Sequence, residues 1–300
     1  MGTFPGTNHT LTLDQNLSEN YFVIIQGADG QGNANGNRGP DENYVSLIAD
    51  PNGSGDLQVS GAADELELFR RNSVSSWVGV ITVVECLSDC ENSGFQLVDV
   101  QRVEHIGNTE IGTDSAQVEW PDIDQVMLMG GVNGSGCDTV ENATNGFAAC
   151  HLRIWPSGTS TIHWQRERTR GQIDDAASTV MVLDWGDEWI VQRVTVSGNN
   201  GGNGVNAPGE YDTAVINQVN RQDSWVWGTG WTNDGGIGDG SEGTVITLGN
   251  GVDINATETT VAVGQEYSDT RETEVYVLSH PKAYVDYAFK TDGNSGDLIY

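Results

Sequence analysis

The chain has 300 residues, enough for two or three domains of ordinary size. Asp and Glu number 43 against 13 Lys and Arg, so the formal net charge is −30 at pH 7, which excludes binding to nucleic acid through a basic surface. The N-terminal segment 1–10 has no basic residue and no apolar core, and the longest apolar stretch, 77–87, is too short and too polar for a membrane-spanning helix. We therefore expect a soluble protein that carries no secretory signal and does not insert into membranes.

The acidic residues are scattered along the chain instead of forming one tail, and only two of the basic residues are lysines, Lys282 and Lys290. Repulsion among so many like charges is largely screened at about 1 M salt, where the Debye length is about 3 Å. We therefore expect a protein that works at high salt, as in a halophilic host. An ordinary acidic surface is the alternative interpretation.

Short apolar segments rich in β-branched and aromatic residues follow one another along the chain, separated by turns rich in Gly, Asn and Asp. They predict β-strands with almost no helix, and six of them occur in the same order in each third of the chain. In the first third they are 10–14, 21–27, 44–48, 65–70, 78–84 and 95–101. In the second they are 116–120, 125–131, 149–154, 160–165, 177–183 and 189–194. In the last they are 213–217, 224–230, 244–248, 259–264, 273–278 and 284–289.

The clearest sign of an internal repeat is the triplet Val-Gln-Arg, which occurs at 100–102 and again at 191–193. Polar segments at 107–113 and 197–209 mark candidate module boundaries. We therefore predict an all-β protein of three tandem β-sandwich modules, jelly-roll-like or immunoglobulin-like, that span 1–107, 108–200 and 201–300. A single continuous β-structure is the alternative.

The four cysteines form two local pairs, Cys86 with Cys90 and Cys137 with Cys150, and neither pair has the spacing of a zinc site. We expect a disulfide between Cys137 and Cys150, which bracket a loop rich in Gly and Asn. A disulfide between Cys86 and Cys90 competes with reduced thiols. Disulfides would indicate an oxidising final location.

The chain contains no G-x-S-x-G, P-loop or H-E-x-x-H motif, and we therefore predict that it is not an enzyme, with a polysaccharide lyase or hydrolase as the alternative. We expect no cofactor, although one Gly-rich loop offers oxygen ligands for a structural Ca²⁺ ion, with a plain loop as the simpler interpretation. The candidate ligands are Asp234, Asp239 and Glu242.

Two further clusters are candidate contact surfaces. Three tryptophans lie close together in sequence and belong either to the core or a subunit interface, or to a platform that stacks on sugars. They are Trp225, Trp227 and Trp231. The one concentration of basic residues is expected to contact carboxylates of a neighbouring subunit. It consists of Arg166, Arg168 and Arg170.

The order of these segments resembles that of a known class of proteins. An aromatic-aliphatic strand, a strand that ends in Arg, a Val-Val-Glu strand and a closing Val-Gln-Arg strand stand at 22–25, 68–70, 83–85 and 100–102. The second copy matches at 126–129, 164–166, 180–184 and 191–193. The third departs from the pattern, with Ala-Phe-Lys at 288–290 and Leu-Ser-His at 278–280. In these features the chain resembles tandem β-sandwich virion structural proteins of tailed viruses.

This resemblance implies an assembly role on the exterior of a virion, as a capsid decoration, turret or spike subunit assembled in the host cytoplasm. The implied partners are further copies of the chain, in a trimer or pentamer, and other virion proteins such as the major capsid protein. A tail or fibre component that binds a host-surface glycan is the alternative.

Overall fold

The structure is a computed structural model that describes residues 2–4, 8–29, 46–47, 64–69, 77–105, 111–116, 118–130, 153–165, 176–198, 212–232, 245–249, 257–264, 271–283, 285, 290–291 and 298–299. Within these ranges the chain forms antiparallel β-strands and no α-helix, which confirms the predicted all-β class.

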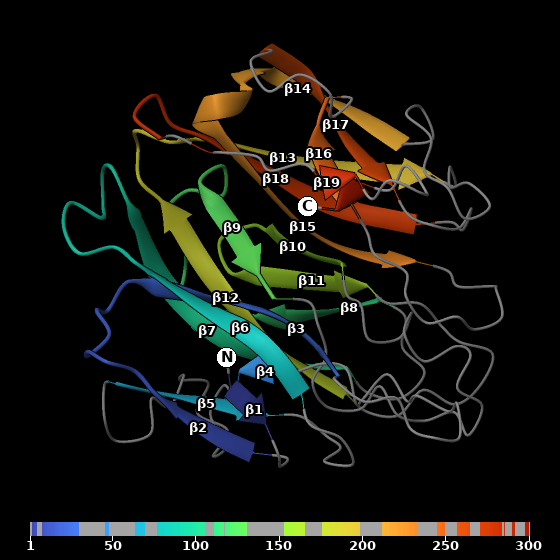
Figure 1. The fold of residues 1–300 in the computed structure, drawn as a ribbon. Helices are drawn as coiled ribbons and strands as arrows, with labels where there is room; N and C mark the ends of the chain where they lie inside the picture. The colour runs from blue at the N-terminus through green and yellow to red at the C-terminus, as the bar shows by residue number, and fades with distance from the viewer. Residues whose placement is uncertain are drawn as a thin grey trace, which may run out of the picture.

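The strands fall into three consecutive groups of six, which we call the first, second and third unit (Figure 1). The first unit contains β1 (Gly2–Phe4), β2 (Asn8–Thr12), β3 (Tyr21–Asp29), β4 (Ser46–Leu47), β5 (Glu65–Phe69) and β6 (Trp77–Glu85). The second contains β7 (Phe95–His105), β8 (Ile111–Ser115), β9 (Val126–Met129), β10 (Arg153–Ser157), β11 (Thr161–Gln165) and β12 (Ala176–Trp185). The third contains β13 (Ile190–Gly198), β14 (Asp212–Asn220), β15 (Ser224–Thr232), β16 (Val245–Leu248), β17 (Thr257–Gly264) and β18 (Arg271–Ser279). The short strands β19 (Lys290–Thr291) and β20 (Leu298–Ile299) follow, and a 3-10 helix, η2 (Arg221–Asp223), precedes β15.

The strand pairing repeats without change from unit to unit. One sheet of each unit has the order first-sixth-third, as in β1-β6-β3, β7-β12-β9 and β13-β18-β15. The other joins the second, fifth and fourth strands, as in β2-β5-β4, β8-β11-β10 and β14-β17-β16. Pairing of first with sixth and of second with fifth is the winding of a jelly roll, one of the two sandwich types expected.

The second and third units defined by this pairing each begin one strand earlier in the chain than the predicted modules. β7 contains the sixth predicted segment of the first copy, yet it pairs with β12, from Phe95 opposite Trp185 to His105 opposite Ala176. In the same way β13 pairs with β18 along its whole length. Polar Gly-rich segments connect the two sheets of one sandwich as readily as they connect two modules, so they did not mark the ends of the units. Independent folding of three modules stays a prediction.

The first-sixth-third sheets of the second and third units are apolar on both faces. In β12, Val180 and Val182 point into the sandwich of the second unit, whereas Met181, Leu183 and Trp185 point to the opposite face; all five are at most 5% exposed. Successive side chains of β9 and of β18 likewise point to opposite faces of the strand, and each face belongs to a different apolar cluster. A strand covered on both faces has this continuous apolar composition.

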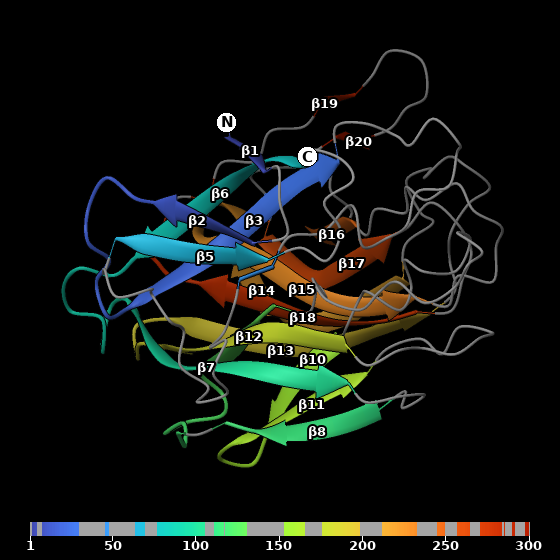
Figure 2. The same ribbon diagram turned by 90° about the horizontal axis from the view of Figure 1, so that it is seen from below.

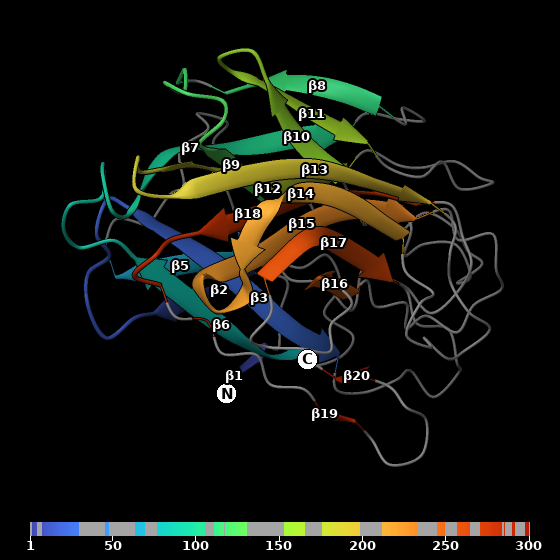
Figure 3. The ribbon, with the colours of Figure 1, turned by 90° about the horizontal axis from the view of Figure 1, so that it is seen from above.

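The second face of these sheets forms a cluster that all three units share. Phe22, Met127 and Trp225 occupy equivalent positions in β3, β9 and β15, and all three belong to this cluster. The ring of Phe22 lies 6.0 Å from that of Trp225 and 6.4 Å from that of Trp185. Trp185 and Trp225 are 6.3 Å apart, so aromatic residues of three units meet at one point. The units therefore close around a common core, while the sheet of β8, β10 and β11 lies on the outside (Figures 2 and 3).

Candidate functional site

Three equivalent turns gather at one end of the molecule, on the left of Figure 1, and we call them the turn cluster. They follow the sixth strand of each unit and comprise residues 86–94, 186–189 and 280–283. The same backbone hydrogen bond begins each of these connections. The N–H groups of Cys86, Trp185 and His280 donate to the carbonyl oxygens of Asn20, Gln125 and Asp223 at 2.9, 3.0 and 3.0 Å.

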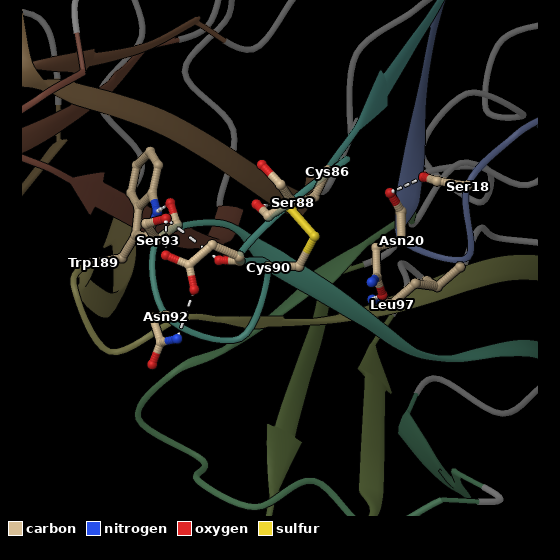
Figure 4. Close-up of a disulfide and its surroundings, with 10 residues drawn as sticks. Ser18, Asn20, Cys86, Ser88, Cys90, Asn92, Ser93, Leu97 and Trp189 are labelled. Atoms are coloured by element: carbon tan, nitrogen blue, oxygen red, sulfur yellow. Dashed lines mark hydrogen bonds between the residues drawn. A yellow bond between two sulfur atoms is a disulfide. The ribbon is translucent and has the colours of Figure 1, made fainter.

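The first turn is closed by a disulfide between Cys86 and Cys90, which is present in the structure (Figure 4). Asp89 has a positive φ of 53°, and its carboxylate accepts hydrogen bonds from Asn92 Nδ2 at 2.7 Å and Ser93 Oγ at 2.8 Å. The hydrogen bond from Asn92, followed by that from Ser93, lowers the pKa of Asp89. Local covalent and polar contacts therefore hold this exposed turn in one conformation.

The second turn lies against the first through backbone groups. Gly186 N–H donates to Gly94 O and Glu188 N–H to Asn92 O, each at 3.0 Å, and Trp189 Nε1 donates to a carbonyl oxygen of the first turn. A side chain at Gly186 would place its Cβ 2.2 Å from Asn92 O, and one at Gly94 would meet the Cys86 sulfur at 2.3 Å. Gly186 is thus required by the close approach of the two turns, and Gly94 by the packing of the first turn against its own disulfide.

The third turn contacts the second through charge. Glu188 Oε2 lies 3.2 Å from both Lys282 Nζ and His280 Nε2, and the His280 and Trp189 rings are 4.9 Å apart. Hydrogen bonds from Lys282 and then from His280 lower the pKa of Glu188. The cluster is therefore a continuous surface to which each unit contributes one turn.

Beside the second turn, Asp184 is half-buried at the end of β12. Burial, followed by the charges of Asp122 and Asp187, raises its pKa to about 6. Asp184 can therefore take up a proton in mildly acidic solution. In the described ranges no three His, Cys, Asp or Glu side chains are grouped so that they could hold a metal ion.

A second polar site joins the second and third units. Arg153 on β10 forms ion pairs with Glu272 at 2.9 Å and Glu274 at 3.0 Å, both on β18. Glu274 is almost fully buried and also accepts a hydrogen bond from Thr195 and pairs with Arg193. Because these partners stand about 120 positions apart in the chain, sequence reasoning missed them, and this network positions one unit on the next.

Next to this network, Ser157 Oγ lies 2.6 Å from His163 Nε2, and the His163 ring stacks on Trp155 with centroids 5.1 Å apart. Burial lowers the pKa of His163, which favours the neutral imidazole. A hydroxyl bonded to a neutral imidazole is one part of a nucleophilic site, but catalysis also needs a group that orients the imidazole. The contacts described for His163 are this hydroxyl and the Trp155 ring.

Basic side chains are used for internal ion pairs. The four that the structure describes each have a glutamate oxygen within 3.9 Å. The pairs are Arg153 with Glu272, Arg193 with Glu274, Arg221 with Glu258, and Lys282 with Glu188. Arg221 is 1% exposed, and its guanidinium also contacts the carbonyl oxygen of Leu248. The basic side chains that the structure describes therefore each neutralise a particular glutamate.

Of the predicted site residues, Trp225 and Trp227 lie on one face of β15 and pack into the shared cluster, with ring centroids 6.1 Å apart. Both are partly buried against this intramolecular cluster, which is the first of the two interpretations given above, and the sugar platform stays a prediction. The side chain of Trp231 lies outside the described residues, as do the candidate Ca²⁺ ligands, the arginine cluster and the second cysteine pair. These are Asp234, Asp239, Glu242, Arg166, Arg168, Arg170, Cys137 and Cys150.

No family model matches the chain, and searches of curated proteins and of solved structures also find no match. Along the described ranges, no helix has the length and apolarity needed to cross a membrane.

Proposed function

We propose that this protein is a non-enzymatic structural protein of a virion, an external decoration, turret or spike subunit on the capsid of a tailed virus with a halophilic host. The observation that carries the proposal is the closure of three sandwiches with one strand order around a shared aromatic core. Such a body is stiff and presents similar outer sheets on several sides, which suits a protein that must keep its shape on a particle surface.

The charge supports the high-salt part of the proposal. The net charge is −30, and the described basic side chains are already paired with glutamates. At about 1 M salt the remaining repulsion is screened beyond about 3 Å. Acidic residues therefore favour solubility in brine without the self-repulsion that they would cause in dilute buffer.

The turn cluster is the surface that we assign to contacts with other virion proteins or with further copies of the chain. Leu87 is 77% exposed beside the disulfide, and Ile190 is 57% exposed where β13 begins. Leu87 lies in the first turn and Ile190 directly follows the second. Hydrogen bonds between units hold both turns, so little entropy would be lost when a partner covers these two side chains.

A tail or fibre component that binds glycans is the other candidate. It depends on the tryptophans of β15, and two of these are partly buried against the shared cluster. This observation favours the capsid role.

The proposal is tested by mass spectrometry of virus particles purified from the source culture. We expect the protein among the structural components at a fixed ratio to the major capsid protein, and its absence from intact particles would contradict the proposal. Leu87→Asp and Ile190→Asp should reduce attachment to particles without lowering stability. Val215→Asp is the matched control, because Val215 is 78% exposed on β14 and neither lies in nor borders one of the three turns.

A further inference from the structure

The first turn differs from the other two in length and in covalent structure. It spans 86–94 and is longer than the second and third turns, which span 186–189 and 280–283. It is also the one turn of the three whose sequence contains cysteines. Each additional residue of a turn adds backbone freedom that must be lost when the turn is ordered. The disulfide between Cys86 and Cys90 removes part of this freedom.

The second turn is held by residues that directly follow this disulfide. Gly94 O and Asn92 O accept backbone hydrogen bonds from the second turn, each at 3.0 Å. Ser93 O accepts a hydrogen bond from Trp189 Nε1, also at 3.0 Å (Figure 4). Three consecutive carbonyl groups just beyond Cys90 therefore carry these contacts between the first and the second unit.

The direction of these carbonyl groups is set inside the disulfide ring. The backbone N–H groups of 92, 93 and 94 all donate to Asp89 O, at 3.3, 3.0 and 3.2 Å. Asp89 lies between the two cysteines and has a positive φ of 53°, which few residues other than glycine adopt. The covalent ring of 86–90 holds Asp89 in this conformation, and Asp89 O in turn fixes the direction of 92–94.

The disulfide also touches this segment directly. A Cβ atom at Gly94 would lie 2.3 Å from Cys86 Sγ and 3.0 Å from Cys90 Cα, so the disulfide packs against the Gly94 backbone. Two thiols cannot keep the bonded distance of about 2.05 Å and must move apart. Their separation displaces Gly94 or releases Asp89, and in either case the carbonyl groups of 92–94 lose their fixed direction.

The same chain of contacts reaches the third turn. The Glu188 N–H donates to Asn92 O, and the carboxylate of Glu188 lies 3.2 Å from both Lys282 Nζ and His280 Nε2. The backbone of Glu188 is therefore positioned by the first turn, and its side chain positions the third. All three turns are connected in series to the disulfide.

We propose that the Cys86–Cys90 disulfide is a redox latch. The oxidised form fixes the contacts among the three turns, and reduction releases them without unfolding the sandwiches. The reductant is a dithiol, which supplies two electrons and two protons. The Sγ–Sγ bond breaks, two thiols form and the dithiol becomes a disulfide. Leu87, Ser88 and Asp89 are exposed between the two cysteines, so the ring is open to such a reagent.

The consequence of the latch for binding rests on the proposed function of the turn cluster. Leu87 lies inside the disulfide ring, and Ile190 directly follows the second turn. Reduction frees both exposed apolar side chains to move, and a partner that covers them must then order them at a cost in entropy. Most cytoplasms keep thiols reduced, so the binding surface becomes fixed when the protein reaches an oxidising environment.

The test compares amide hydrogen exchange of the purified protein before and after reduction with dithiothreitol. We expect exchange at Gly186 and Glu188 to become faster by about tenfold or more, although these residues lie outside the unit that contains the cysteines. The Trp120 N–H is the matched control, because it donates to Thr159 O at 2.9 Å in a contact between loops of the second unit. Its exchange should not change. Unchanged exchange at Gly186 and Glu188, or an equal acceleration at Trp120, overturns the proposal.

A double variant separates this disulfide from the other cysteine pair. Cys86→Ala with Cys90→Ala should show rapid exchange at 186–189 both with and without dithiothreitol. Acceleration of the double variant by dithiothreitol would assign the effect to Cys137 and Cys150 and would contradict the latch.

A second variant tests whether the disulfide acts through the contact between the turns. Gly186→Ala separates the turns by other means, because its Cβ would lie 2.2 Å from Asn92 O. Exchange at Glu188 should then be rapid and insensitive to reduction, and a response equal to that of the wild type would refute the proposed route. These measurements use the purified protein alone, so they decide on the latch whatever the outcome for the proposed function.

Discussion

Replacing Trp185 by Ala is the most direct test of the shared core. Trp185 is 5% exposed, and its ring lies 4.6 Å from that of Trp189, 5.4 Å from that of Phe95 and 6.3 Å from that of Trp225. These neighbours come from β7, β15 and the turn before β13, so the cavity left by Trp185→Ala would open between units.

The expected loss follows from the buried surface. A buried aromatic side chain removes about 150–250 Å² from water, and at about 25 cal/mol per Å² this corresponds to about 4–6 kcal/mol. Ala keeps part of this contact, and truncations of large aromatic residues in cores cost about 3–5 kcal/mol. A loss of about 4 kcal/mol lowers the folding equilibrium constant by about a thousandfold.

The assay is urea unfolding at about 1 M salt, followed by circular dichroism of the strands and by hydrogen exchange in each unit. We expect one cooperative transition for the whole chain, shifted as a whole by Trp185→Ala and left within about 0.5 kcal/mol by the exposed control Val215→Ala. Separate transitions, with only that of the second unit affected, would refute the shared core and support three independent modules.

Three further predictions concern charge and covalent structure. Asp184→Asn should stabilise the protein at pH 7–8 and have little effect below pH 4. The pKa of Asp184 is raised to about 6 in the folded state, so the wild type loses stability as the pH rises from about 4 to 6. Thermal unfolding across this pH range checks the sign, and a gain that is equal at pH 4 and pH 8 would contradict it. Dilution of salt below about 1 M should lower the unfolding temperature steadily, because the net charge of −30 is then less screened. A temperature that does not change with salt in differential scanning fluorimetry would remove the high-salt interpretation. Cys86→Ala with Cys90→Ala should cost about 2 kcal/mol, the value expected for so short a loop, and the reduced wild type should match the double variant in the denaturation midpoint.

Local patterns in the sequence were sufficient for the strands and for the existence of a repeat. The alternation of apolar residues and the Gly-rich turns predicted almost every long strand, because a strand with a core on one side must place apolar side chains at every second position. The continuous apolar run of β12 already differed from this alternation. It indicates a strand covered on both faces, which the prediction of separate modules did not take into account.

The tertiary structure decided at which strand each repeat begins and where the candidate site lies. The Val-Gln-Arg triplets do fall in equivalent strands, but Val100 lies opposite Met181 whereas Val191 lies opposite Leu278, the equivalent of Leu183. The two triplets therefore stand two positions apart in register, and no local pattern reports which partner a strand will choose. The core position of Trp225 and the meeting of three turns at one end have the same origin. They depend on packing between units about 100 residues apart, whereas composition and spacing report only what lies near in the chain.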